Sequence, residues 1–393
     1  MSISPLHLIL SLLTLAAAAT SQAHAKGWQH AQLLNLPEES FCKSSRIWAS
    51  KYGGFHAVYL NCDPHRVQYR RYTNGRIGPV KILDSNFAAN PEICEDGSGH
   101  VHVVWEDWES EGNFLGYAVS TDGGNTWSME RLTKLLGCKH PLIVPFGPID
   151  GSRVLMSFTK IIQGEPNSIY YSMFNGRRWS NVVEIGSQPD NHYMIEGMCR
   201  SLQDGTVYRL YGKGLGDGKW ALVFRRFNGE HWEPEVVVYT GPFFARHSIA
   251  VNPIGQIMVV WEVNEVVMSK LYTPGFGWSD IMSLEAKTGY AHVTAIPGSN
   301  DFYLTYTRNV RCVYGRRFSG GKWSPPELVS VGLPEAFTVG TRVTADPNGS
   351  GTLYACWEYW GSGRPQQYFS VKPGGKPIDA TNIGAAQEQD SQR

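Results

Sequence analysis

The chain has 393 residues, of which 12% are aromatic and only 18% are charged, and it contains 42 glycines. Many aromatic residues and glycines with few charges are typical of short β-strands joined by tight turns, so an all-β protein is expected. Lys plus Arg and Asp plus Glu each number 35, so no overall charge attracts nucleic acid or an anionic membrane surface.

The first 25 residues have the pattern of a secretory signal peptide. A mostly apolar run over residues 8–19 is followed by Ala23-His24-Ala25, whose small residues suit cleavage after Ala25. The run is shorter than the roughly 20 apolar residues that cross a membrane, and no later segment reaches this length. We therefore expect a secreted chain, extracellular or periplasmic, without membrane insertion and with a mature part that begins at residue 26.

A unit of four predicted strands repeats along the mature chain. One of its motifs has a turn glycine, a tryptophan, a polar residue and an aliphatic pair, and its copies are 52, 53, 46 and 45 residues apart. The tryptophans of these copies are Trp127, Trp179, Trp232, Trp278 and Trp323. A second motif, an apolar strand that ends in an aromatic residue and a charge, occurs seven times. Spacings of this size are typical of the blades of a β-propeller.

The seventh unit lacks the tryptophan motif, and the missing copy stands at the other end of the mature chain, where Trp28 begins a short strand. A ring can close when the N-terminal strand completes the last blade, which removes exposed sheet edges. The predicted fold is therefore a seven-bladed, all-β propeller over residues 26–378. The polar tail, residues 379–393, is expected to be disordered.

The seven cysteines are scattered, without the paired spacing that marks a zinc site. Cys42 and Cys62 both fall in the first repeat, and export permits disulfides, so a bond between these two is one hypothesis. Buried, unpaired thiols are the alternative for the rest. No cofactor and no metal ligands are predicted, although a structural calcium ion is left open.

The segment Ser120–Trp127 resembles the Asp-box of sialidase-type β-propellers, a hairpin between the third and fourth strands of a blade. In blade number the chain is similar to the ulvan-lyase type of polysaccharide lyase, and glycan-binding lectins also have such blades. The resemblance implies a carbohydrate ligand and, from the blade number, a lyase or a lectin before a sialidase. We expect a monomer whose partner is an acidic polysaccharide or another glycan.

In a propeller, the starts of the first strands and the ends of the second strands meet at one face. The predicted starts carry Arg46, Asn90, His140, His192, Tyr193, Arg246, His247, His292 and Arg342. The predicted ends carry Asp63, Glu106, Asp107, Lys160, Lys213, Glu262, Arg308 and Glu358. A rim of cations, histidines and a tyrosine suits an anionic sugar, because cations neutralise its carboxylate while His or Tyr transfers protons.

The leading hypothesis is β-elimination on a uronic acid. Tyr193 and His192 are the candidate base and acid, and the neutralising cation is Lys213, Arg246 or the mid-strand Arg209. The glycine-rich segment 211–218 resembles the loop that follows the catalytic tyrosine in ulvan-lyase relatives. Those relatives carry a histidine where this chain has Ala89 before Asn90, so His140 of the next blade is the candidate substitute. The remaining rim residues, His247, His292, Arg342 and Arg46 among them, are predicted to bind substrate.

Two alternatives stay open. The resemblance to sialidases implies an arginine triad, for which Arg46, Arg246 and Arg342 are candidates, and an acid, for which Asp63 is the candidate. It also implies a tyrosine and glutamate pair that acts as the nucleophile, to which the sequence assigns no residues. A lectin would instead repeat one binding pocket in each blade. Finally, three rim carboxylates each follow a tryptophan at the same place in the repeat, which predicts that they tie blades together. These are Glu106, Glu262 and Glu358.

Overall fold

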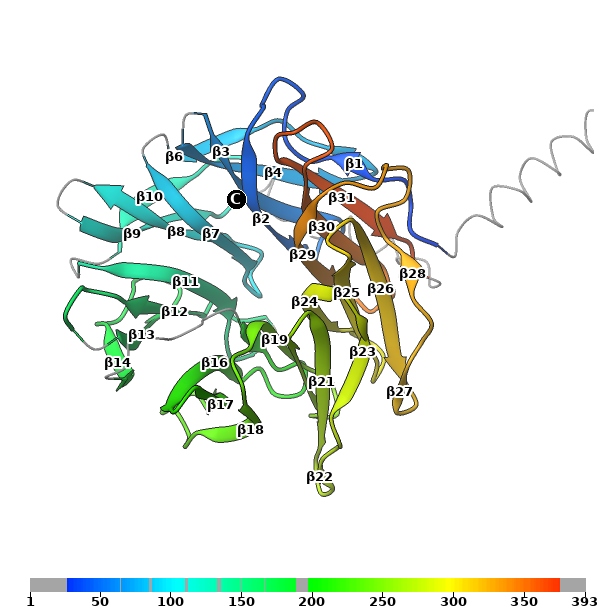
Figure 1. Ribbon diagram of the computed structural model, residues 1–393. Helices are drawn as coiled ribbons and strands as arrows, with labels where there is room; N and C mark the ends of the chain where they lie inside the picture. The colour runs from blue at the N-terminus through cyan, green and yellow to red at the C-terminus, as the bar shows by residue number, and fades with distance from the viewer. Residues whose placement is uncertain are drawn as a thin grey trace, which may run out of the picture.

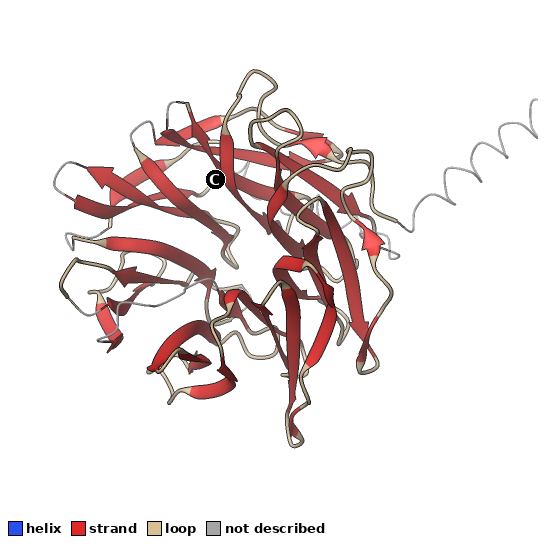
Figure 2. Ribbon diagram, in the orientation of Figure 1, coloured by secondary structure: helices blue, strands red, loops and turns tan. Residues whose placement is uncertain are grey.

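The computed structural model describes residues 27–63, 65–84, 87–109, 112–132, 136–148, 150–165, 167–188 and 197–374. Within these ranges the regular secondary structure is entirely β, in seven antiparallel sheets arranged as blades around a central axis (Figures 1 and 2). The prediction of a seven-bladed, all-β propeller is confirmed. The predicted signal peptide and the C-terminal tail lie outside the described residues.

Each blade has an inner strand next to the axis. From blade 1 to blade 7 these are β2 (Cys42–Ala49), β7 (Ala88–Glu95), β11 (Cys138–Pro145), β15 (Gly197–Arg200), β19 (Ala245–Val251), β24 (Thr288–Ala295) and β29 (Thr338–Ala345). The second strands are β3 (Phe55–Cys62), β8 (Val101–Glu109), β12 (Val154–Lys160), β16 (Val207–Gly216), β20 (Ile257–Val263), β25 (Phe302–Arg308) and β30 (Leu353–Tyr359).

The outer strands complete each blade. The third strands are β4 (His65–Thr73), β9 (Gly112–Ser120), β13 (Asn167–Phe174), β17 (Lys219–Phe227), β21 (Val266–Thr273), β26 (Cys312–Ser319) and β31 (Gln366–Lys372). The outermost strands are β5 (Arg76–Ile77), β6 (Lys81–Asp84), β10 (Ser128–Arg131), β14 (Val183–Gln188), β18 (Val236–Gly241), β22 (Gly277–Trp278), β23 (Met282–Ala286), β27 (Lys322–Trp323), β28 (Glu327–Leu328) and β1 (Gln32–Leu33).

The ring closes through the N-terminal strand, as predicted. Strand β1 is antiparallel to β31, with Gln32 opposite Phe369, so the start of the chain forms the outer edge of blade 7. Trp28 is buried and donates from Nε1 to the hydroxyl of Tyr303 in blade 6 at 2.9 Å. The N-terminal segment therefore bonds to both the last blade and the one before it.

The repeated tryptophans pack between blades. The ring of Trp127 lies 4.8 Å from that of Tyr69 in the preceding blade, and Trp179 lies 5.2 Å from Tyr117 in the same way. Aromatic pairs at these separations stabilise an interface beyond the apolar area that they bury. The tryptophans of blades 2 and 3 thus belong to the core between blades.

The hypothesis of a disulfide between Cys42 and Cys62 is wrong, because all seven cysteines are free. Cys42 lies opposite Asn61 in the pairing of β2 with β3. Successive side chains on a strand point to opposite faces, so Cys62 faces away from Cys42. Burial raises the pKa of the Cys42 thiol well above its usual value.

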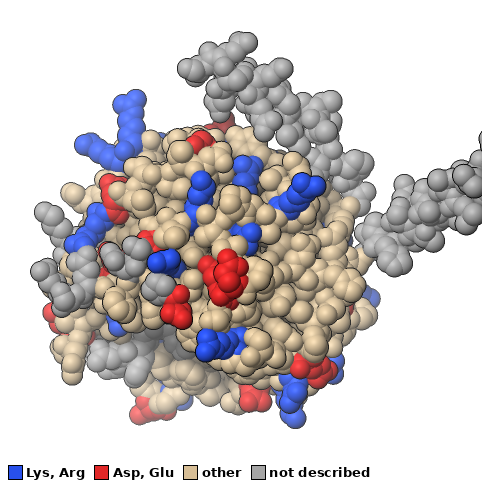
Figure 3. All heavy atoms as spheres, turned by 90° about the horizontal axis from the view of Figure 1, so that it is seen from above, with Lys and Arg blue, Asp and Glu red and all other residues tan. Residues whose placement is uncertain are grey.

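On the face seen in Figure 3, basic side chains lie interspersed with acidic ones, consistent with the equal numbers of each in the sequence. Among the described residues, no helix has the length and apolar character needed to cross a bilayer.

Candidate functional site

Within the described residues, six of the seven inner strands contain a β-bulge near their first residues, at the same end of the ring. The pairing register shifts there, and the extra residue, which we call the bulge residue, has a left-handed φ of 42–66°. The bulge residues are Ser44, Asn90, His140, Arg246, Tyr290 and Gly340. A bulge redirects the side chains around it, so these positions present chemistry at the face of the ring rather than in the core.

Three glutamates connect bulges to the blades before them. Glu106 accepts from the backbone N–H of His140 at 2.7 Å, and Glu262 accepts from that of Tyr290 at 3.2 Å. Glu358 accepts from the backbone N–H of Ser44. In each case the carboxylate belongs to the second strand of one blade and the N–H to the inner strand of the next. The predicted role of these glutamates in tying blades together is confirmed.

A cavity of about 170 Å³ lies at this end of the ring, and we call it the arginine pocket. Three arginines from three blades line it, Arg46 on β2, Arg246 on β19 and Arg342 on β29. Its other lining residues are Ser44, Ser45, Tyr290, Ala291, Gly340, Glu358 and Gln367.

Neighbouring groups hold the arginines in place. The Nη1 atom of Arg246 lies 3.1 Å from both carboxylate oxygens of Glu262, and its guanidinium carbon lies 3.7 Å from the centre of the Tyr290 ring. The Nε atom of Arg46 donates to Glu92 at 2.5 Å. Arg342 donates from Nη1 to the carbonyl of Thr341 at 3.2 Å. Ion pairs and a cation–π contact of this kind fix a guanidinium before a ligand arrives.

Glu358 is the acidic residue of the pocket. Burial raises the pKa of its carboxyl, and the bonds from the Trp360 indole and the Ser44 backbone, with the charge of Lys43, offset part of that rise. The Trp360 Nε1 atom lies 2.7 Å from Glu358 Oε1. A carboxyl with a raised pKa that lines a pocket is a candidate for proton transfer.

A larger cavity of about 470 Å³ extends along the inner strands. Its lining is mostly apolar, with Arg46 and Arg342 near the starts of the strands and Lys51 and Asp96 beyond their ends. Because Arg46 and Arg342 line both cavities, they lie between the arginine pocket and the central cavity.

The histidines do not occupy corresponding positions, which corrects the reading of a single rim. His140 is a bulge residue, whereas His247 follows its bulge residue by one position and His292 follows by two. The extra residue of each bulge shifts any count of positions made along the sequence. His292 lines the central cavity, where burial and the charges of Arg342 and Arg46 lower its pKa well below the usual value.

Several other predicted residues lie away from the arginine pocket. Asn90 donates to Glu106 at 2.7 Å, and the side chain of His140 is 45% exposed beside the same carboxylate. Lys213 pairs with Glu235 at 3.0 Å. Asp63 is exposed on the turn after β3.

Arg209 and His247 are both buried, and neither lines either of the two cavities. In the described part of the chain, no nitrogen of the Arg209 guanidinium has a hydrogen-bond partner, whereas His247 bonds to the backbone of Leu210. Burial lowers the pKa of Arg209 to about 9 and, with the charge of Arg209, lowers that of His247 to about 3. His192 and Tyr193 lie outside the described residues, so their roles stay predictions.

The structure thus brings Arg46, Arg246 and Arg342 together, as the arginine-triad hypothesis predicted. Sequence reasoning missed Tyr290 as a pocket residue and assigned Glu358 only a structural role. Tyr290 lies two residues before His292, which was already a predicted rim residue. Only the position of the bulge, however, shows that Tyr290 rather than His292 lines the arginine pocket.

No protein-family model matches this chain, and no curated protein sequence matches it. Solved structures share its fold. A protein of unknown function from Dyadobacter fermentans has a TM-score of 0.56 at 11% identity, over 88% of this chain and 98% of its own. The Hadza microbial sialidase Hz136 has a TM-score of 0.52 at 16% identity, over 81% and 76%. AofleA from Arthrobotrys oligospora has a TM-score of 0.52 at 13% identity, over 78% and 91%. What this chain shares with them is the β-propeller fold.

Proposed function

We propose that this protein is a secreted carbohydrate-active enzyme that binds the carboxylate of an acidic sugar in the arginine pocket and hydrolyses its glycosidic bond. The observation that carries the proposal is the convergence of Arg46, Arg246 and Arg342, from three blades, on one small cavity. The fold shared with the sialidase Hz136 is consistent with it.

Arginine is the side chain best suited to this ligand. Its planar guanidinium donates two parallel hydrogen bonds to a carboxylate, which a lysine ammonium cannot do. Glu262 holds Arg246 and Glu92 holds Arg46, so these two cations are positioned at little further entropic cost when an anion binds.

The size of the pocket favours a terminal sugar. Its volume of about 170 Å³ is below the roughly 300–1,000 Å³ of sites that enclose a whole ligand. The pocket therefore suits the acidic end of one sugar, with the rest of the glycan outside the ring. This arrangement supports exo-action on a terminal residue.

Two further lining residues supply chemistry for hydrolysis. The resemblance to sialidases implies a tyrosine and a glutamate in the site, and Tyr290 and Glu358 both line the arginine pocket. The raised pKa of Glu358 suits a group that gives a proton to the leaving oxygen and later takes one from water. β-Elimination receives less support. Of its described candidates, Arg246 lines the pocket, but His140, Lys213 and Arg209 do not.

The test is hydrolysis of fluorogenic sialosides and glucuronides by the purified chain and by Arg342→Ala, with Arg364→Ala as the matched control. Arg364 is an exposed arginine that bonds to Ser40 and does not line the pocket. Loss of a charge-assisted bond of about 1.5–3 kcal/mol predicts binding about 10- to 100-fold weaker in Arg342→Ala only. If Arg342→Ala hydrolyses these substrates as well as Arg364→Ala does, the assignment of the arginine pocket as the substrate site is wrong.

Two companion assays separate the remaining possibilities. Uronic-acid polysaccharides are followed by the ultraviolet absorbance of unsaturated ends, and a rise would overturn hydrolysis in favour of β-elimination. Calorimetry with acidic sugars counts binding sites. Several equivalent sites without turnover would overturn the enzyme and indicate a lectin.

A further inference from the structure

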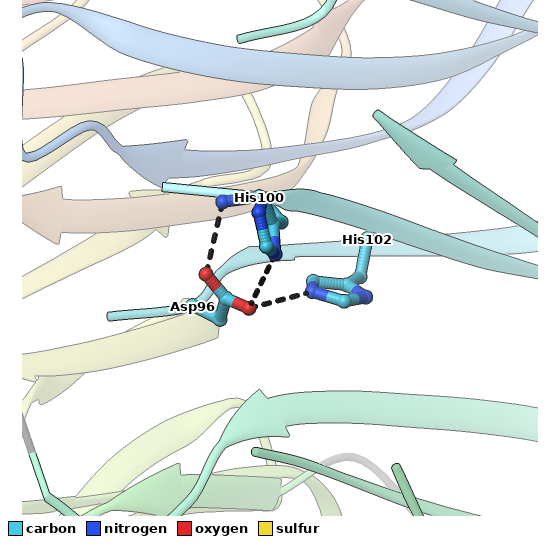
Figure 4. A group of neighbouring side chains, drawn as sticks. All are labelled: Asp96, His100 and His102. Atoms are coloured by element: carbon cyan, nitrogen blue, oxygen red, sulfur yellow. Dashed lines mark hydrogen bonds and ion pairs between the residues drawn. The ribbon is translucent and has the colours of Figure 1, made fainter. Parts of the chain in front are cut away.

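A second group of side chains lies at the opposite end of the inner strands, in blade 2. Asp96 follows the last residue of β7, and His100 and His102 lie just before and within β8. The Asp96 Oδ2 atom is 3.2 Å from His100 Nδ1 and 3.3 Å from His102 Nε2, and the three atoms all lie within 4.8 Å of one another (Figure 4). We propose that Asp96, His100 and His102 form a zinc-binding site.

The two distances from the carboxylate oxygen to the imidazole nitrogens, 3.2 and 3.3 Å, fit a shared ion. Ligands that are about 2.0 Å from a zinc ion at tetrahedral angles lie about 3.3 Å apart. A direct hydrogen bond from an imidazole to a carboxylate is ordinarily shorter, about 2.7–2.9 Å. Two imidazole nitrogens with one carboxylate oxygen are also a donor set that zinc prefers over calcium or magnesium.

The surroundings orient the ligands. The second ring nitrogen of His102, Nδ1, lies 2.7 Å from the hydroxyl of Tyr117, and the other oxygen of Asp96 accepts from the His100 backbone N–H at 2.9 Å. A hydrogen bond at the remote nitrogen is what fixes a ligating histidine with its other nitrogen toward the metal. The Asp96 and His102 side chains are fully buried, whereas that of His100 is 30% exposed. Water can therefore occupy a fourth position from the exposed side.

Blade 1 provides an internal comparison. It repeats the histidine–tyrosine pair, with His56 Nδ1 at 2.7 Å from the Tyr69 hydroxyl. The same turn in blade 1, however, has Ser50 and Gly54 where blade 2 has Asp96 and His100, as the matching backbone bonds show. Packing of the repeat explains the histidine–tyrosine pair in both blades. It does not explain the aspartate and the second histidine in the turn of blade 2. In blade 1 the histidine has only Glu95 of the neighbouring blade nearby, with Oε1 at 3.9 Å from His56 Nε2, and its turn has no second histidine.

Two residues of opposite charge, Lys51 and Glu95, lie beside this turn. Lys51 donates from its ammonium to the carbonyl of Gly97 in this turn, and the carboxylate of Glu95 accepts from the Lys51 backbone N–H at 2.8 Å. A cation and an anion thus stand side by side next to the site. The site is independent of the arginine pocket, which lies at the other end of the inner strands.

The test is zinc binding by the purified chain after removal of metals with a chelator, measured by calorimetry and by elemental analysis after dialysis. We expect one zinc ion per chain in the wild type. His100→Ala and Asp96→Asn should each weaken binding at least 10-fold, since the first removes a ligand and the second its charge while keeping the turn bond to the backbone. His231→Ala, which removes an exposed histidine of blade 4, is the matched control and should bind zinc as the wild type does.

Cobalt substitution distinguishes the site from binding by cysteine. A tetrahedral site of nitrogen and oxygen ligands gives d–d absorption without a sulfur-to-cobalt charge-transfer band. Thermal midpoints without metal confirm that the variants fold. The proposal is overturned if the wild type retains no zinc, if the variants bind it as tightly as the wild type, or if the cobalt spectrum shows sulfur ligands. The three residues are then a hydrogen-bonded turn only.

Discussion

The carboxylate of Glu106 allows a direct test of how the glutamates join neighbouring blades. Glu106 is 1% exposed, and it accepts from the His140 backbone and the Asn90 side chain at 2.7 Å each and from the Trp108 indole at 2.9 Å. Hydrogen bonds to a charged group contribute about 1.5–3 kcal/mol each. Trp108 is 47% exposed, so its N–H can bond to water when the carboxylate is removed. We expect Glu106→Ala to lower the free energy of unfolding by about 2–4 kcal/mol, chiefly through the His140 N–H left without a partner.

Thermal unfolding measures this effect. At about 2.1 cal/mol/K of unfolding entropy per residue, a chain of 393 residues shifts its midpoint by about 1–2 °C for each kcal/mol. Glu106→Ala should therefore lower Tm by about 2–5 °C, and Glu106→Gln, which keeps an acceptor, by less. Glu230→Ala, at an exposed loop position, is the control. A loss in Glu106→Ala no larger than in the control would refute the reasoning.

Two further predictions concern ionisation and thiols. Burial opposes ionisation of Asp122, but bonds from Thr126, Ser120 and Asn125 outweigh it and lower the pKa of Asp122 from 3.8 to about 2. A group whose pKa is lower in the folded state stabilises that state above its unfolded pKa. The Tm gap between wild type and Asp122→Ala should therefore be full above pH 3.8 and close as the pH falls to about 2; a gap that is constant with pH contradicts this. Thiol titration in denaturant without reductant should give seven thiols per chain, whereas a Cys42–Cys62 disulfide would leave five.

The fold was predictable because each blade packs against its neighbour through the same kinds of residues. A tryptophan such as Trp127 must pack on the preceding blade, so its motif recurs at the length of a blade. The missing seventh copy could be traced to Trp28 for the same reason. Such a signal is redundant, since the loss of one motif leaves the others readable.

The candidate site was only partly predictable, because bulges alter the register. Arg46, Arg246 and Arg342 were grouped from the sequence, yet Arg246 is a bulge residue while the other two lie two residues beyond their bulges. They meet because an arginine side chain is long enough to span this offset. The shorter side chains of His140 and His292 cannot span it. Although the sequence suggested equivalent positions, His140 is a bulge residue, whereas His292 lines the central cavity.

The metal-ligand group of blade 2 was missed for a different reason. A search for paired cysteines and for histidines at the rim does not detect Asp96, His100 and His102, whose spacing spans one turn and the strand after it. The spacing by itself is uninformative, because the turn could have placed the carboxylate away from both rings. Only the geometry of the turn brings the three atoms together.

The bulges show how a repeated fold can carry varied chemistry. A left-handed φ costs a residue other than glycine or asparagine about 1–2 kcal/mol. At the bulge after a blade with a glutamate, the residue is Ser44, His140 or Tyr290, and the glutamate bonds to its N–H.

Blades 1 and 6 have Leu60 and Thr307 in the register position of that glutamate. The bulge residues that follow them are Asn90 and Gly340, which adopt this φ at the least cost. A glutamate of the preceding blade thus bonds to the bulge residue where that residue type adopts a left-handed φ at a cost. Arg246 has a strained φ of 42° and is instead held by its side chain, through Glu262 of its own blade and the ring of Tyr290. Backbone strain that is held by contacts of the side chain is characteristic of functional positions. It supports Arg246 as the arginine around which the pocket is built.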